Sequence, residues 1–151
     1  MGFSMSNDAK KYFNKLDESK HGKFKVQFDF YYLCLMAGLL NETPGECKGE
    51  KFVDEFPGIY TMQREQIIGL LIATQINRNK IDIENRERIE RLMLKLVKPD
   101  SPTRLSDYGE SLMNQYAENG FKRICEKIPT PPSNLDTFLV SYCERVLPKS
   151  K

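Results

Sequence analysis

The sequence contains a single histidine and only nine glycines in 151 residues. Histidine is the most frequent general acid or base near neutral pH, so acyl transfer that needs histidine would depend on His21 alone, in a polar stretch typical of a solvated loop. The glycines never form G-x-G-x-x-G or G-x-x-x-x-G-K-[ST], the patterns that cradle nucleotide phosphates. The common histidine-based and nucleotide-based chemistries are therefore not indicated.

Cysteine is also sparse, with four residues and no C-x-x-C pair. Together with the single histidine, this spacing does not predict a zinc site of the usual kind. The four residues are Cys34, Cys47, Cys125 and Cys143. All except Cys47 lie among apolar residues of expected helices, where a free cysteine behaves as a small hydrophobic residue. We expect reduced thiols in a cytoplasmic protein, with a Cys125–Cys143 bridge as the alternative.

Long apolar runs are missing as well. The longest, 28–40, is interrupted by Asp29 and is shorter than the roughly 20 residues that a bilayer-spanning helix needs. The first residues lack the positively charged and then apolar regions of a secretory signal. The formal net charge of +2 is too small to indicate a nucleic-acid binder by itself. The expectation is a cytoplasmic chain that does not associate with a membrane.

The sequence does contain many apolar residues at helical spacing. They predict an all-α fold in one helical domain over 1–151, with about six helices covering 8–16, 26–40, 61–77, 83–97, 107–119 and 135–148. Short, uneven helices with prolines between them favour an irregular or orthogonal bundle over a regular four-helix bundle. A short extended segment near 22–30 is the alternative at the aromatic start of the second helix.

The apolar patterns of these helices differ. The helix over 26–40 is apolar on every side, which predicts a place in the centre of the core. The helix over 83–97 has one clear apolar face, formed by Ile89, Leu92, Met93, Leu96 and Val97. Gly69 weakens the helix over 61–77 by about 1 kcal/mol relative to alanine unless something packs closely on it.

Three segments outside the main helical patterns carry further expectations about helix ends and connections. Asn119-Gly120 is a natural left-handed stop, after which 121–128 restarts or continues as a helix. Five prolines and glycines within 41–60 predict a long irregular connection, and loops of that length are usually functional or mobile. The lysine-rich segment 1–25 is expected to be a loosely packed N-terminal arm.

Acidic pairs occur at Asp54/Glu55, Asp82/Glu84 and Asp107/Glu110. The last pair falls in the first turn of an expected helix, where negative charge offsets the helix dipole, so its structural explanation is better than a catalytic one. No residue is assigned a catalytic role, and neither a metal ion nor a cofactor is expected.

Basic residues form two sets. One set surrounds the helix over 83–97 and is the candidate surface for nucleic acid or a protein partner: Arg78, Lys80, Arg86, Arg88, Arg91 and Lys95. The pairs Glu84–Arg88 and Glu87–Arg91 are spaced i, i+4 and neutralise much of it. The other set lies near Tyr12, Phe13 and Phe24, and comprises Lys10, Lys11, Lys15, Lys20, Lys23 and Lys25. Stacking of bases on these aromatics is one interpretation, and their burial is the favoured one.

Three segments carry a family resemblance: 28–39 (FDFYYLCLMAGL), 105–109 (LSDYG) and 113–121 (MNQYAENGF). Together they cover 26 of the 151 residues, mainly at core positions. They resemble stretches of small helical accessory proteins that are encoded with bacterial anti-phage defence systems, including those linked to DNA modification or to larger ATPase partners. The resemblance implies a non-catalytic subunit of a larger complex that acts on DNA, and it assigns no catalytic residue.

These observations predict an adaptor or accessory subunit rather than an enzyme, with a larger protein as its partner. The docking surface would be 41–60 or an exposed helix face. The alternatives are a helical module that binds nucleic acid directly through the arginine set, and an enzyme of an unfamiliar type whose site is assembled by folding. The sequence does not fix the oligomeric state.

Overall fold

The computed structural model describes residues 2–18, 24, 26–132 and 134–148. His21, Lys20, Lys23 and Lys25 lie outside these residues. The described chain is mostly helical, as predicted, with six helices: α1 (Asn7–Asp17), α2 (Gln27–Leu40), α3 (Arg64–Arg78), α4 (Arg86–Leu96), α5 (Asp107–Lys127) and α6 (Leu135–Ser141). A 3₁₀ turn (Gly58–Tyr60) precedes α3, a π-helical turn (Tyr142–Val146) follows α6, and two strands, β1 (Phe3–Met5) and β2 (Glu50–Val53), form a small sheet.

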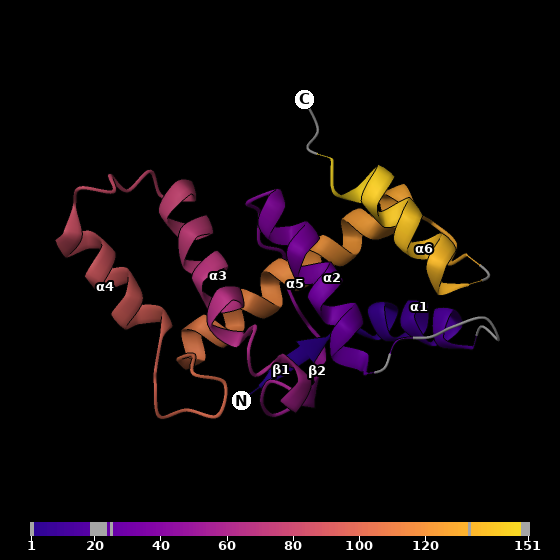
Figure 1. Ribbon diagram of the computed structural model, residues 1–151, viewed down its shortest axis with the longest axis horizontal. Coiled ribbons are helices and arrows are strands. Elements are labelled where there is room, and N and C mark those ends of the chain that lie inside the picture. Colours follow the sequence, from indigo (N-terminus) through magenta and orange to yellow (C-terminus); the bar gives the residue numbers. More distant parts are fainter. Residues whose placement is uncertain (1, 19–23, 25, 133, 149–151) are drawn as a thin grey trace.

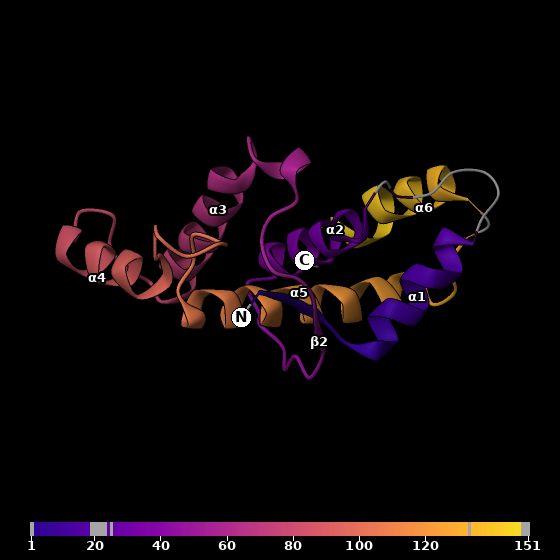
Figure 2. The same ribbon diagram turned by 90° about the horizontal axis from the view of Figure 1, so that it is seen from below.

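The centre of the molecule is the contact between α2 and α5 (Figures 1 and 2). The α2 helix is buried on most sides, as its uniformly apolar sequence predicts. A Cβ atom added to Gly120 would lie 1.6 Å from the carbonyl oxygen of Cys34, and one added to Gly38 would lie 1.8 Å from that of Tyr116. The two helices therefore meet backbone against backbone, and glycine is the residue that allows it.

Gly120 does not end a helix, so the stop predicted at Asn119-Gly120 is wrong. The α5 helix continues to Lys127, with Ile128 as its C-cap. Gly120 has helical backbone geometry rather than the expected left-handed conformation. The lack of a side chain at this position serves the close contact with α2 and not the end of a helix. The continuous helix spans the molecule from α4 at one end to α6 at the other (Figure 1).

Both strands lie at positions where helix or loop was expected. The extended segment predicted near 22–30 is not a strand in the described residues, because α2 begins at Gln27. Instead β1 pairs antiparallel with β2, with Phe3 opposite Val53 and Met5 opposite Glu50, so 41–60 is not wholly irregular. Strands of three and four residues have too few side chains to show an alternating pattern.

One buried asparagine holds β1 on α5. The Oδ1 atom of Asn114 accepts hydrogen bonds from the Ser4 amide at 3.0 Å and from the Tyr31 hydroxyl at 2.7 Å. Its Nδ2 donates to the carbonyl oxygen of Gly2 at 3.2 Å. Thus the N-terminal strand is fixed by a fully partnered side chain as well as by its pairing with β2.

The N-terminal segment is part of the core, contrary to the loosely packed arm expected for 1–25. Phe3, Met5, Tyr12, Phe13 and Leu16 are all buried. The rings of Phe3, Tyr12 and Phe13 contact Phe28 and Phe30 of α2, and Phe24 is half-buried against Phe13. Tyr12 and Phe13 are therefore buried, as the favoured interpretation of the aromatics near the lysine set expects, rather than open for base stacking. The lysines between them take the solvent side of α1.

The α3 and α4 helices form an arm at one end of the molecule, away from α1 and α6 (Figures 1 and 2). We call 64–104 the α3–α4 arm. It joins the body through buried Ile67 and Leu71 of α3, through Leu96 of α4, and through a bridge between Val97 and Leu105. Of the predicted apolar face of α4, Leu96 is buried, Ile89, Leu92 and Val97 are partly buried, and Met93 is exposed.

Candidate functional site

The six basic residues selected from sequence all lie on the α3–α4 arm. Arg78 ends α3, Lys80 follows it with a positive φ of 53°, and the other four lie along α4. All six are exposed. The structure therefore brings them to one part of the molecule, although the α4 residues are spread along the helix.

Several of these basic residues already have intramolecular partners. Arg91 pairs with Glu87 at 3.1 Å, as the i, i+4 spacing predicts. The Nζ atom of Lys95 lies 4.2 Å from the centre of the Tyr108 ring. Burial raises the pKa of the Tyr116 hydroxyl, and Arg78 opposes this shift by hydrogen bonding to it. Among the four basic residues of α4, Arg91 and Lys95 thus have contacts within the chain, which makes Arg86 and Arg88 the more available charges for a partner.

The arm has an apolar surface as well as a basic one. Ile83 and Leu94 are each 79% exposed, Leu70 is 46% exposed and Met93 is 45% exposed. Ile83, Met93 and Leu94 lie on or just before α4, whereas Leu70 lies on α3 near Met36 and Leu39 of α2. Single exposed apolar residues are common on protein surfaces, and several large ones close together in the chain are candidates for an interaction surface. The predicted apolar face of α4 is largely covered, and the most exposed apolar residue of the helix, Leu94, lies outside that face.

A groove of about 390 Å³ runs between α3 and α4. Its floor is apolar, with Ile68, Gly69 and Ile72 from α3 and Met93 and Val97 from α4. Glu65, Pro99 and two arginines, Arg64 and Arg104, complete the lining. We call this surface the α3–α4 groove.

The two arginines of the α3–α4 groove were not among the residues selected from sequence. Arg104 has a φ of 65°, and its guanidinium donates a hydrogen bond to the Pro99 carbonyl at 3.0 Å. The Nε atom of Arg64 is buried without a hydrogen-bond partner. The sequence gives no signal for either, since each is separated from the basic set by more than a helical turn.

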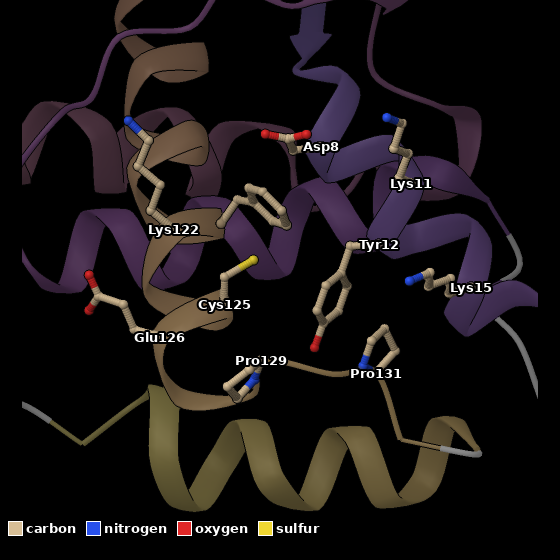
Figure 3. A pocket seen from close by; sticks show the side chains of 10 residues that line it. Asp8, Lys11, Tyr12, Lys15, Lys122, Cys125, Glu126, Pro129 and Pro131 are labelled. Carbon is tan, nitrogen blue, oxygen red and sulfur yellow. The ribbon is translucent and has the colours of Figure 1, made fainter.

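A second cavity, of about 530 Å³, lies between α1, the end of α5 and the connector that follows it (Figure 3). Tyr12, Phe121 and Cys125 form its apolar part. Three lysines and two acids surround them: Lys11, Lys15, Lys122, Asp8 and Glu126. Figure 3 shows the Cys125 sulfur turned toward the cavity and the Glu126 carboxylate turned outward. Because the charges are mixed, the cavity favours neither sign strongly.

The chemistry available in this second cavity is limited. Burial raises the pKa of the Cys125 thiol, so the reactive thiolate is scarce at neutral pH. Burial likewise raises the pKa of Tyr12, whose hydroxyl donates a hydrogen bond to the Ile128 carbonyl at 2.9 Å. Neither group is prepared to act as a nucleophile or base.

The acidic pairs do not assemble into a site. Glu110 is only 3% exposed, and burial raises the pKa of its carboxyl. Asp107 lies at the exposed start of the same helix, and Asp54 pairs with Lys51, which lowers its pKa. Across the described part of the chain, no three histidine, cysteine or acidic side chains converge in a way that could hold a metal ion. In the same residues, no helix combines the length and apolar character needed to cross a membrane.

The features described so far define a class: a mostly helical chain with a small two-stranded sheet and a projecting pair of helices that carries several exposed apolar and basic residues. Comparisons with protein-family models, with curated proteins and with solved structures give no match. A functional proposal therefore has to start from the surfaces of this chain, of which the α3–α4 arm is the most distinctive.

Proposed function

We propose that this chain is a non-catalytic adaptor or accessory subunit that docks on a larger protein through its α3–α4 arm. One observation carries the proposal: Leu94 on α4 and Ile83 just before it are each 79% exposed, and the adjoining Met93 lines the apolar α3–α4 groove. Large apolar side chains that face water next to an apolar groove are typical of a surface that a partner covers. A partner bound there would bury the side chains that the described chain leaves exposed.

The energetics support docking at this surface. Ile83 and Leu94 are each 79% exposed, whereas Leu70 and Met93 are about half exposed. Burying a fully exposed apolar side chain is worth roughly 1.5–3 kcal/mol, and a half-exposed one contributes about half of that. The total is reduced by the entropy of association, yet two or three of these residues buried together are comparable with the hot spots of known interfaces.

The finer part of the proposal comes from the resemblance of 28–39, 105–109 and 113–121 to accessory proteins of anti-phage defence. On this basis we propose a bacterial, cytoplasmic complex that acts on DNA. The resembling segments belong mainly to α2 and α5, which form the core, so they support a common scaffold more directly than a common partner.

Direct nucleic-acid binding is the second candidate function. The observation in its favour is that Arg86 and Arg88 are exposed on a projecting helix. The residues from 64 to 104 include nine basic and six acidic side chains, a net charge of +3. Because the acids alternate with the arginines on α4, the phosphate-binding stripe is interrupted, and we rank this function below the adaptor.

The adaptor function is tested with Leu94→Glu. Its matched control is Val140→Glu on α6, at the opposite end of the molecule, where the side chain is 56% exposed. Both variants should fold, because neither side chain is buried. The tagged chain is expressed in its native cell, and co-purified proteins are quantified by mass spectrometry. We expect a stoichiometric partner with wild type and with Val140→Glu, and its loss with Leu94→Glu.

A partner retained equally by Leu94→Glu would show that the arm is not the docking surface. A wild-type chain that elutes as a free monomer from its native lysate would refute the adaptor function. The nucleic-acid alternative is tested by electrophoretic mobility with Arg86→Glu/Arg88→Glu over a salt series, since contacts with several phosphates give steep salt dependence. Absence of any shift at low salt with the wild-type chain would remove that alternative.

A further inference from the structure

Gly69 occupies an unusual place in the α3–α4 groove. It lies in the middle of α3 and is exposed, and a Cβ atom added to it would meet nothing within 4 Å. Glycine in a helix interior lowers helix stability relative to alanine. At Gly38 and Gly120 the close approach of another helix accounts for the glycine, but at Gly69 nothing within the described chain does.

Arg64 is the second unusual residue, one helical turn and a little more before Gly69. Its Nε atom is buried and has no hydrogen-bond partner. A buried N–H without an acceptor is unfavourable. Arg64 also lines the groove, so its guanidinium adds positive charge to the groove wall, where a carboxylate of a partner would be favoured.

The remaining surface between these two residues is apolar. Ile68 and Ile72 flank Gly69 along α3, while Met93 and Val97 face them from α4. The volume of about 390 Å³ is at the small end of the range for ligand pockets, which run from roughly 300 to 1,000 Å³. The groove is therefore suited to a few side chains of one element rather than to a whole domain.

We propose that the α3–α4 groove binds one amphipathic, acidic α-helix of a partner protein. The apolar stripe of that helix lies on Ile68, Ile72 and Met93, its backbone crosses α3 at Gly69, and an Asp or Glu side chain pairs with the guanidinium of Arg64. This inference rests on the proposed adaptor function, and it specifies the chemistry of the partner.

Two arguments favour this occupant over others. A helix can bring its backbone close to α3 only where α3 lacks a side chain, as Gly38 and Gly120 show inside the same molecule. The net charge of +3 over 64–104 favours an acidic partner and opposes a second copy of the same positively charged arm.

The probe is a synthetic peptide of about 20 residues, long enough to form a helix, with leucine and alanine on one face and glutamate on the other. A second peptide carries glutamine in place of glutamate, and a third carries lysine. Binding to the full chain is measured by fluorescence anisotropy. We expect the glutamate peptide to bind most tightly and the lysine peptide not to bind.

Two substitutions test the contacts. Gly69→Ala should raise the melting temperature of the chain, because it improves α3, and yet weaken the glutamate peptide by about tenfold or more, because the new methyl group keeps the backbones apart. Arg64→Gln should weaken the glutamate peptide by a similar factor and leave the glutamine peptide unchanged. The gain in stability separates the first effect from misfolding.

The inference is overturned if the glutamate peptide does not bind, if the lysine peptide binds equally well, or if Gly69→Ala binds like the wild type. One further outcome would contradict the groove proposal while leaving the adaptor function intact. If the native partner is lost with Leu94→Glu but fully retained by both Gly69→Ala and Arg64→Gln, the chain is an adaptor that docks outside the groove.

Discussion

Replacing Gly120 with alanine tests the central packing of the fold. The added Cβ atom would lie 1.6 Å from the carbonyl oxygen and 2.7 Å from the carbonyl carbon of Cys34, and 2.6 Å from the amide nitrogen of Gly38. All three atoms belong to the backbone of α2, so no side-chain rotation relieves the overlap. Either α2 and α5 move apart along their contact or the helices bend.

The size of the effect follows from two opposing contributions. Alanine favours a helix over glycine by about 1 kcal/mol, which would stabilise α5. Overpacking a core typically costs about 1–3 kcal/mol and sometimes more, and here the overlap involves rigid backbone in the most extensive helix contact of the molecule. Because backbone cannot rotate away, we take the cost at the upper end of that range, about 3 kcal/mol, and expect a net loss of about 2 kcal/mol in the free energy of unfolding after the gain of about 1 kcal/mol.

The measurement is urea denaturation followed by far-UV circular dichroism. With a slope of about 1–3 kcal/mol per molar urea, the midpoint should fall by about 1 M. Gly69→Ala is the matched control, because it makes the same chemical change in a helix interior where the Cβ atom meets nothing within 4 Å, and its midpoint should rise. A Gly120→Ala midpoint at or above that of the wild type would refute backbone contact between α2 and α5.

Three further substitutions test individual interactions. Asn114→Ala removes the hydrogen bonds that the asparagine makes with Ser4 and Gly2, and it leaves the buried Tyr31 hydroxyl without its acceptor. Thermal denaturation should show a loss of about 3 kcal/mol in the free energy of unfolding, and an unchanged melting temperature would contradict this role. Burial raises the pKa of Glu110, so its contribution to stability is favourable at low pH and is lost as pH rises through the folded-state pKa. Glu110→Gln should therefore stabilise the chain at neutral pH and have little effect in acid, and an equal effect at both pH values would be contrary evidence. Ser106→Ala removes the cap whose Oγ accepts from the Gly109 amide at 3.0 Å, which should cost about 1 kcal/mol in urea denaturation, and no change would mean that water replaces the cap.

Most helices could be predicted because their signals are local. Ser6 and Ser106 cap α1 and α5, and both helices begin at the following residue. The uniformly apolar sequence of α2 correctly predicts its central position. In each case the determining residues lie within a turn or two of the element that they form.

The failures share a different cause, which is dependence on distant segments. β1 is a strand because β2, almost fifty residues later, offers it a partner and Asn114 supplies further hydrogen bonds. Gly120 is helical because α2 packs on it, although the Asn-Gly pair by itself is typical of a helix end. A single sequence contains no record of which segments meet, so these outcomes could not be read from local pattern.

The candidate site shows the same division. The basic residues of α4 could be listed from sequence because charge and spacing are local, and the structure adds only that they share one arm. The α3–α4 groove could not be predicted, since Arg64 and Met93 become neighbours only when the two helices pack. Gly69 was the one available signal, as a residue that weakens its helix without a visible reason.

The helical glycines of the body and of the α3–α4 arm differ in what packs on them. In the body, glycine at positions 38 and 120 lowers helix propensity but allows α2 and α5 to pack closely, and the apolar side chains around these glycines are buried. In the arm, Gly69 has the same low helix propensity but no neighbour within 4 Å of an added Cβ atom, and α4 exposes the apolar side chains of Met93 and Leu94. Since both features weaken the free chain and lie on the same two helices, a helix that packs into the groove between them would account for both at once.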